Sequence, residues 1–218
     1  MSEQDFNYDV LIGNAGVIAE KKKFTPEGLE WSFGVNHIGH FTFILSYLNE
    51  IEASRFPKRI VLTSSAAHMF VKHDPDFKDY NYDNRKWSTI DSYSMSKFAN
   101  AMFSRKLAQL VPEIEVFSVH PGCVQSDLQR DLKTASIIVK IIAPIFQFFL
   151  RSKRAGCQSL LYAGFSNDDE LSSNSGGYVM NCRIAEDYAT TWSRRQEFID
   201  SLWAKSEQIT KLKLNGFK

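Results

Sequence analysis

Four short apolar runs are spaced along a chain that otherwise consists of longer stretches of mixed polarity. Each run is rich in β-branched or aromatic residues and is bounded by charged residues, glycine or proline, which is typical of buried strands. The runs cover residues 9–12 (DVLI), 60–65 (IVLTSS), 115–119 (EVFSV) and 178–182 (YVMNC).

The stretches between these runs favour helices. Thr25 is a suitable N-cap, and Pro26 stands at a first helical position, where its missing N–H costs nothing. Strands that alternate with helices in this way predict an α/β fold with a parallel sheet. The expected helices cover residues 26–51, 92–110, 154–165 and 192–209, and residues 68–90 are expected to form a loop.

Composition narrows the class of protein. The 218 residues, of which 44% are hydrophobic and 23% charged, fit one globular domain over residues 1–218. A net charge of +1 argues against a nucleic-acid partner. The three cysteines lack metal-ligand spacing, so we expect reduced thiols, an intracellular protein and no metal site. We expect no signal peptide, because the first nine residues are polar and acidic, and no transmembrane span, because the most apolar stretch, residues 137–150, is too short.

The pair Tyr93 and Lys97 is the strongest chemical signal. Positions i and i+4 share a helix face, and an ammonium group near a phenol lowers the phenol pKa, so that tyrosine becomes usable as a general acid or base. Taken alone, this spacing arises most often by chance. Ser65 ends a predicted strand, where its hydroxyl either polarises a substrate carbonyl or satisfies backbone groups.

Two further positions point to a ligand site. Asn36 falls within a predicted helix, where asparagine is a poor choice, and alone it is best explained by hydrogen bonds to backbone or water inside the fold. The turn at residues 13–16 (GNAG) follows the first predicted strand and allows a close approach to the backbone. Ligands of parallel α/β sheets bind beyond the carboxyl ends of the strands, where several of these residues fall.

The order of five motifs resembles the short-chain dehydrogenase/reductase superfamily. They are NAG, VNHIGHF, IVLTSS, YSMSK and HPG, and the surrounding sequence is similar to the retinol-dehydrogenase-like branch, which includes the WW-domain-containing oxidoreductase. The resemblance covers almost the whole chain. It implies a partial Rossmann-type, doubly wound parallel sheet, the C-terminal portion of that fold, and an NAD- or NADP-dependent oxidoreductase that interconverts an alcohol and a carbonyl.

The resemblance also implies roles for single residues. Tyr93 matches the proton donor and acceptor, and Lys97 matches the lysine that lowers the tyrosine pKa and holds the nicotinamide ribose. Ser65 matches the serine that polarises the carbonyl, and Asn36 the asparagine that anchors a water in the proton relay. The remaining cofactor-binding positions are Asn14, Ala15 and Gly16 along the adenosine side, Pro121 and Gly122 over the nicotinamide, and Ser126 at the carboxamide.

One motif of the family, TGxxxGxG, is not found in this sequence. Its glycines cradle the cofactor pyrophosphate, so we expect weakened NAD(P) binding and an unpaired sheet edge at residues 9–12. Two outcomes stay open here: a catalytically impaired fragment or pseudoenzyme that acts as an interaction protein, or a half-sheet that self-associates into a homo-oligomer through that edge.

The apolar stretch at residues 137–150 matches the substrate lid of the family. It suggests a lipophilic substrate such as a retinoid, a steroid or another apolar alcohol or aldehyde, while an ordinary core helix and contact with a membrane surface remain alternatives. The expected location is therefore cytoplasmic, or peripheral to an intracellular membrane.

Overall fold

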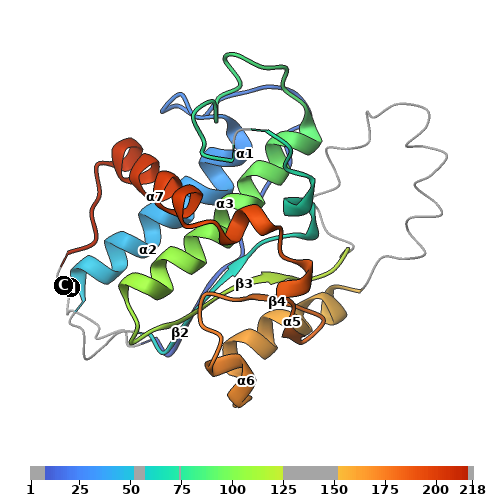
Figure 1. The fold of residues 1–218 in the computed structure, drawn as a ribbon, viewed down its shortest axis with the longest axis vertical. Coiled ribbons are helices and arrows are strands. Elements are labelled where there is room, and N and C mark those ends of the chain that lie inside the picture. Colours follow the sequence, from blue (N-terminus) through green and yellow to red (C-terminus); the bar gives the residue numbers. More distant parts are fainter. Residues whose placement is uncertain (1–7, 52–56, 74, 125–151, 216–218) are drawn as a thin grey trace, which may run out of the picture.

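The computed structural model describes residues 8–51, 57–73, 75–124 and 152–215 (Figure 1). Its centre is a sheet in which the described strands follow one another in the order β1-β2-β3-β4-β5. The first four are parallel, and β5 pairs with β4 in the antiparallel sense. The strands are β1 (Val10–Gly13), β2 (Arg59–Thr63), β3 (Glu115–His120), β4 (Tyr178–Met180) and β5 (Arg183–Ile184).

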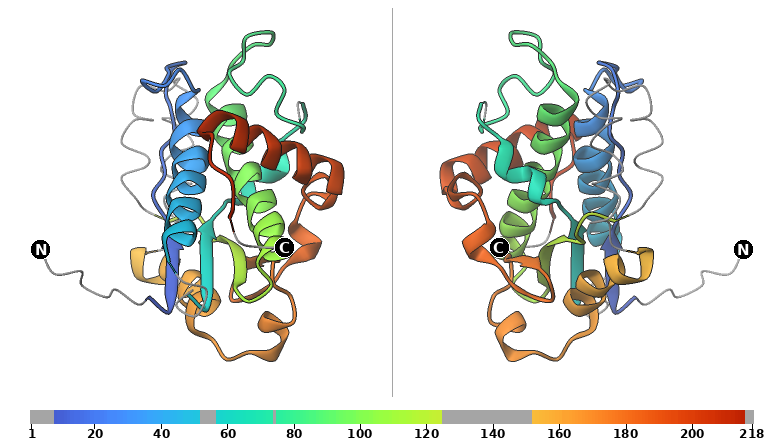
Figure 2. Two further views of the ribbon diagram at one scale, coloured as in Figure 1. Left: turned by 90° about the vertical axis from the view of Figure 1, so that its left-hand side faces the viewer. Right: turned by 90° about the vertical axis from the view of Figure 1, so that its right-hand side faces the viewer.

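Helices cover both faces of the sheet, which confirms the predicted doubly wound α/β class (Figures 1 and 2). One face carries α1 (Trp31–Phe33), the π-helical η1 (Gly34–Ile38), α2 (Gly39–Glu50), α3 (Thr89–Leu110) and α7 (Gln196–Thr210). The other face carries α5 (Lys153–Phe165) and α6 (Asp169–Ser172).

Strand β2 is buried along its whole length, as expected for a central strand. Ile60 and Leu62 point into the core formed with α2 and α3, whereas Val61 points into the core formed with α5. This alternation follows from the period of two along a strand. An apolar run with no polar face is therefore explained by helices on both sides.

The predicted start of the first helix is wrong. Thr25 does not cap a helix; its backbone N–H and C=O bond to Leu29 and Gly28, closing a tight loop. Gly28 has a φ of +78°, a left-handed conformation that ends any helical path from Pro26. The helix begins instead at Trp31, after the N-cap Glu30.

The last predicted helix is divided. The 3₁₀ turn η6 (Thr191–Arg194) precedes Arg195, whose extended backbone separates it from α7. Other short elements were not predicted: α6, β5, and the 3₁₀ turns η3 (Ala66–Phe70) and η5 (Glu186–Tyr188).

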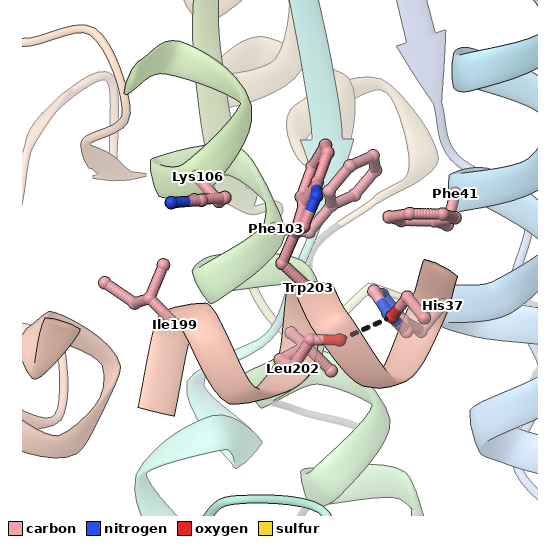
Figure 3. A pocket seen from close by; sticks show the side chains of 8 residues that line it. His37, Phe41, Phe103, Lys106, Ile199, Leu202 and Trp203 are labelled. Carbon is pink, nitrogen blue, oxygen red and sulfur yellow. Dashed lines mark hydrogen bonds between the residues drawn. The ribbon is translucent and has the colours of Figure 1, made fainter. Parts of the chain in front are cut away.

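Helix α7 is attached to the rest of the molecule by a buried polar contact. His37 Nε2 lies 2.8 Å from the Ser206 hydroxyl, and the aromatic side chains of Phe41, Phe103 and Trp203 lie around this contact (Figure 3). Burial lowers the pKa of His37 to about 3, so this histidine is neutral near pH 7. The aromatic side chains fill the space, so this contact belongs to the core.

The structure bears on several expectations about the sheet edge, the cysteines and the apolar segments. β1 lies at the end of the strand order and pairs with β2, so the described part of the sheet has the expected edge there. The free thiols of Cys123, Cys157 and Cys182 are exposed. Among the described residues, no helix has the length and apolarity needed to cross a bilayer. The apolar stretch at residues 137–150 lies outside the described residues.

The cap of α1 provides a test of this fold. Glu30 is fully buried, and its carboxylate accepts bonds from Phe33 N at 2.9 Å and Trp87 Nε1 at 3.2 Å. We expect Glu30→Ala to lower the free energy of unfolding by about 1–2 kcal/mol in urea denaturation, because it leaves both donors unpaired. Glu27→Ala, at an exposed carboxylate, is the control. Equal stability of the two variants would contradict this role of Glu30.

Candidate active site

The site lies where three parallel strands end. The parallel register pairs Gly13 with Leu62 and Thr63 with Val119, so the carboxyl ends of β1, β2 and β3 meet at one edge of the sheet. The segments that follow these ends are residues 14–16, 64–65 and 121–122. The sequence prediction that they gather at one edge is therefore confirmed.

Helix α3 brings Tyr93 and Lys97 to this edge. The Lys97 ammonium lies 5.7 Å from the centre of the Tyr93 ring. Its Nζ donates to the Thr63 carbonyl at 3.0 Å, and the side chain is only 2% exposed. The lysine is thus directed along the end of β2.

The Lys97 ammonium is buried with backbone oxygen as its partner. None of the ion pairs formed between described residues includes it. Burial disfavours the charged form and lowers the pKa of Lys97 to about 8. A lysine that titrates there gives up its proton far more readily than a surface lysine does.

The pKa of Tyr93 differs from the sequence expectation. Burial raises it above its ordinary value, while the hydrogen bond with Ser65 lowers it. The expected lowering by Lys97 is wrong for this structure, because desolvation is the largest influence on the Tyr93 pKa and the Lys97 ammonium is bonded to Thr63. Tyr93 therefore holds its proton firmly.

The two serines at the end of β2 have different positions. The Ser64 hydroxyl is buried and donates to the Lys97 carbonyl at 2.8 Å, a contact that fixes α3 to the sheet. The Ser65 hydroxyl oxygen accepts a bond from Ala67 N at 3.1 Å, as the N-cap of η3. This leaves the Ser65 proton available for the Tyr93 phenol, whereas the Ser64 proton is used by the Lys97 carbonyl.

Asn36 lies in the π-helical segment η1 and is fully buried. Its Oδ1 accepts from Val17 N at 2.7 Å, and its Nδ2 donates to Val17 O and Ser96 Oγ, both at 2.9 Å. The side chain thus clamps the segment after β1 onto α3. This confirms the bonds to backbone inside the fold; the role in a water relay stays a prediction.

Gly16 makes a close approach to the same cluster. A Cβ atom at this position would lie 3.3 Å from both Lys97 Nζ and Asn36 Oδ1. Nearby, the exposed Asn14 accepts a bond at its Oδ1 from the Thr63 hydroxyl at 2.9 Å, and Ala15 is exposed. Glycine keeps the space above Lys97 free of side-chain atoms.

The structure describes part of the third predicted segment, which follows β3. Pro121 and Gly122 follow β3 at the same edge, and Gly122 has a φ of +87°, which favours glycine. Ser126 lies outside the described residues.

Sequence reasoning missed two groups at the centre of the site. The Thr63 carbonyl accepts from Lys97 and also from Asn100 Nδ2, at 3.1 Å. A backbone carbonyl has no sequence signal of its own. Asn100 had one: like Asn36, it is an asparagine in a helix interior, and it stands three residues after Lys97 on the same face.

Comparisons with known proteins identify relatives of this chain. The chain is 31% identical over 214 residues to human retinol dehydrogenase 13, which covers 96% of this chain and 62% of the relative. It is 32% identical over 202 residues to retinol dehydrogenase 12 of Mus musculus, covering 92% and 60%. No protein-family model matches the chain.

The chain belongs to the short-chain dehydrogenase/reductase family, in its retinol-dehydrogenase-like branch. It spans about three fifths of the length of the retinol dehydrogenases that it matches.

Solved structures agree in fold. An uncharacterised protein of Mycobacterium paratuberculosis has a TM-score of 0.69 at 24% identity, covering 97% of this chain and 70% of that one. A 4-hydroxyisoleucine dehydrogenase mutant in complex with NADH and succinate has a TM-score of 0.56 at 16% identity, covering 81% and 68%.

The described residues fit the nicotinamide-ribose end of the dinucleotide used in this family. The Lys97 ammonium has three protons, and among the described residues its hydrogen-bonded acceptor is the Thr63 carbonyl, so donors remain for ribose hydroxyls. Gly16 leaves room beside it that a Cβ atom would fill.

The buried ammonium predicts an unusual response of stability to mutation. Folding lowers the Lys97 pKa from 10.5 to about 8, so below pH 8 the folded protein holds a charge that is more stable in the unfolded chain. We expect Lys97→Met to raise the free energy of unfolding at pH 7 by about 1–3 kcal/mol, the fall in pKa being equivalent to roughly 3 kcal/mol before the lost bond to Thr63 is subtracted.

The unfolded chain binds more protons than the folded one between pH 8 and pH 10.5, so wild-type stability rises there and the advantage of Lys97→Met shrinks. Urea unfolding of both proteins at pH 7 and pH 10 measures this change. Lys72→Met removes an exposed lysine and controls for charge. A difference that is independent of pH would contradict the buried charge.

Proposed function

We propose that this chain is an NAD(P)-dependent oxidoreductase that interconverts an alcohol and a carbonyl. The observation that carries the proposal is the grouping of Ser65, Tyr93 and Lys97 at the carboxyl edge of the sheet, with Gly16 beside the lysine. The names of the relatives support the reaction type, since they are retinol dehydrogenases.

The dinucleotide, when bound, supplies or accepts the hydride. On the protein side, Lys97 holds the nicotinamide ribose through the protons that Thr63 does not use. Pro121 and Gly122 would lie over the nicotinamide, Ser126 would bond its carboxamide, and the segment 14–16 would run along the adenosine side. The protein thereby orients the cofactor and the substrate, which makes the reaction between them effectively unimolecular.

Tyr93 moves the proton. In carbonyl reduction, its phenol donates a proton to the substrate oxygen as the carbonyl group becomes an alcohol. Ser65 donates a hydrogen bond to the same oxygen. The raised pKa of Tyr93 keeps this proton in place at neutral pH, which suits the role of an acid. In the oxidation direction, the Tyr93 oxygen must first lose its proton to solvent through the water relay that Asn36 would anchor. The positive charge of Lys97 favours this loss, as would that of an oxidised nicotinamide ring.

The substrate that we propose is lipophilic, such as a retinoid, a steroid or another apolar alcohol or aldehyde. Exposed apolar side chains stand close in sequence to both reactive residues: Met69 and Phe70 follow Ser65 on η3, and Ile90 stands three residues before Tyr93 on α3. Phe70 is 59% and Ile90 70% exposed, so both side chains have apolar surface available to a ligand.

A second candidate function rests on the β1 edge. Ile12 on this edge strand is 37% exposed, and an open edge is a template for pairing with another chain. In that case the chain is a catalytically impaired interaction protein or a homo-oligomer that binds NAD(P) weakly. Calorimetric titration with NADPH and NADH separates the two, since micromolar affinity would contradict weakened binding.

The proton-transfer role of Tyr93 is tested by Tyr93→Phe. We expect this variant to lose turnover by about two orders of magnitude or more, because the phenol proton has no substitute. The assay follows NADPH consumption with retinal and a panel of smaller aldehydes.

Tyr188→Phe removes the hydroxyl of an exposed tyrosine and should keep wild-type turnover. A loss of less than threefold in Tyr93→Phe, or equal losses in both variants, would remove Tyr93 from the role of proton donor.

A further inference from the structure

Behind Ser65 lies a buried histidine that the proposed reaction does not use. His68 is fully buried on η3. Its backbone N–H donates to the Ser65 carbonyl at 3.0 Å, and its ring Nδ1 lies 2.6 Å from the same oxygen. One residue therefore holds this carbonyl twice.

The other ring nitrogen fixes the tautomer. The backbone N–H of Thr190 points at His68 Nε2 from 3.3 Å. A backbone N–H only donates, so Nε2 carries the lone pair and the proton is on Nδ1. Nδ1–H then donates to Ser65. Burial lowers the pKa of His68, so the ring is neutral at pH 7 and this arrangement persists there.

The ring is also held from its flank. The centre of the Tyr178 ring lies 4.7 Å from that of His68. Tyr178 is itself held, because its backbone N–H donates to Glu186 Oε1 at 2.7 Å and Glu186 pairs with Arg105 at 2.7 Å. The residues around β4 and η6 thus form a fixed support for His68.

We propose that His68 is the residue that positions Ser65 for the reaction. Its two bonds fix the peptide plane after Ser65, and the bond from Ala67 N to the Ser65 hydroxyl oxygen at 3.1 Å holds that oxygen, so the hydroxyl proton remains available to Tyr93. The proposal rests on the proposed function, in which Ser65 and Tyr93 share the substrate oxygen.

Two substitutions of equal polarity separate the two ring nitrogens. In His68→Asn, the amide nitrogen takes the place of Nδ1 and can still donate to Ser65. In His68→Gln, the amide oxygen reaches the place of Nε2 and can accept the Thr190 N–H. The bond to Thr190 is then kept, and the bond to Ser65 is lost. Both variants shorten or reshape a buried ring, so both are expected to lose thermal stability.

The kinetic effects should differ. We expect His68→Gln to lower kcat about tenfold or more with little change in KM, since small displacements of a reacting group cost large factors in rate. His68→Asn should stay within about threefold of wild type, because it preserves the donor on which Ser65 depends. His73→Asn, at an exposed histidine, is the matched control.

A second readout does not need turnover. In protein labelled at tyrosine Cζ, the Tyr93 resonance, assigned by its absence in Tyr93→Phe, should move in His68→Gln and keep its position in His68→Asn and His73→Asn. If the variants show this pattern of resonance shifts but the wild-type protein has no turnover, the proposed function fails and the role of His68 stands. Equal kinetic losses in both His68 variants, no loss in either, or an unmoved Tyr93 resonance in His68→Gln would overturn it.

Discussion

The site depends on one backbone carbonyl, that of Thr63 at the end of β2. It accepts the Lys97 ammonium at 3.0 Å and the Asn100 amide at 3.1 Å, while the Thr63 hydroxyl bonds to Asn14. An ammonium group that is 2% exposed is costly to bury without a carboxylate, and the lowered pKa of Lys97 records that cost. The parallel sheet provides the compensation, because β2 ends in a carbonyl that accepts bonds from side chains at this point.

The shared acceptor also explains how the lysine can serve a ligand. If Lys97 turns toward another oxygen, Asn100 still bonds to Thr63, so no buried carbonyl is left unpaired. Asn36 and Gly16 border the same ammonium, one as a clamp on Val17 and the other as open space. The residues that hold the Lys97 ammonium in place therefore also allow it to exchange the Thr63 carbonyl for an oxygen of a ligand.

Much of this could be predicted from the sequence. The apolar runs identified the four parallel strands, because buried strands need uninterrupted apolar residues, and YSMSK placed Tyr93 and Lys97 on one helix face. Local signals failed where tertiary contacts decide: Thr25 had the chemistry of a cap, but the turn at Gly28 takes the chain elsewhere. The tyrosine pKa failed for the same reason, since desolvation follows from packing and is absent from spacing.

The central claim is that Lys97 is a buried cation held by the end of β2. Its most direct test is an NMR titration of the lysine Cε resonances, with Lys97 assigned from the signal that disappears in Lys97→Arg. The account predicts a midpoint for Lys97 at about 8, well separated from the exposed lysines. A midpoint near the ordinary value of 10.5 would show a solvated ammonium and contradict the account.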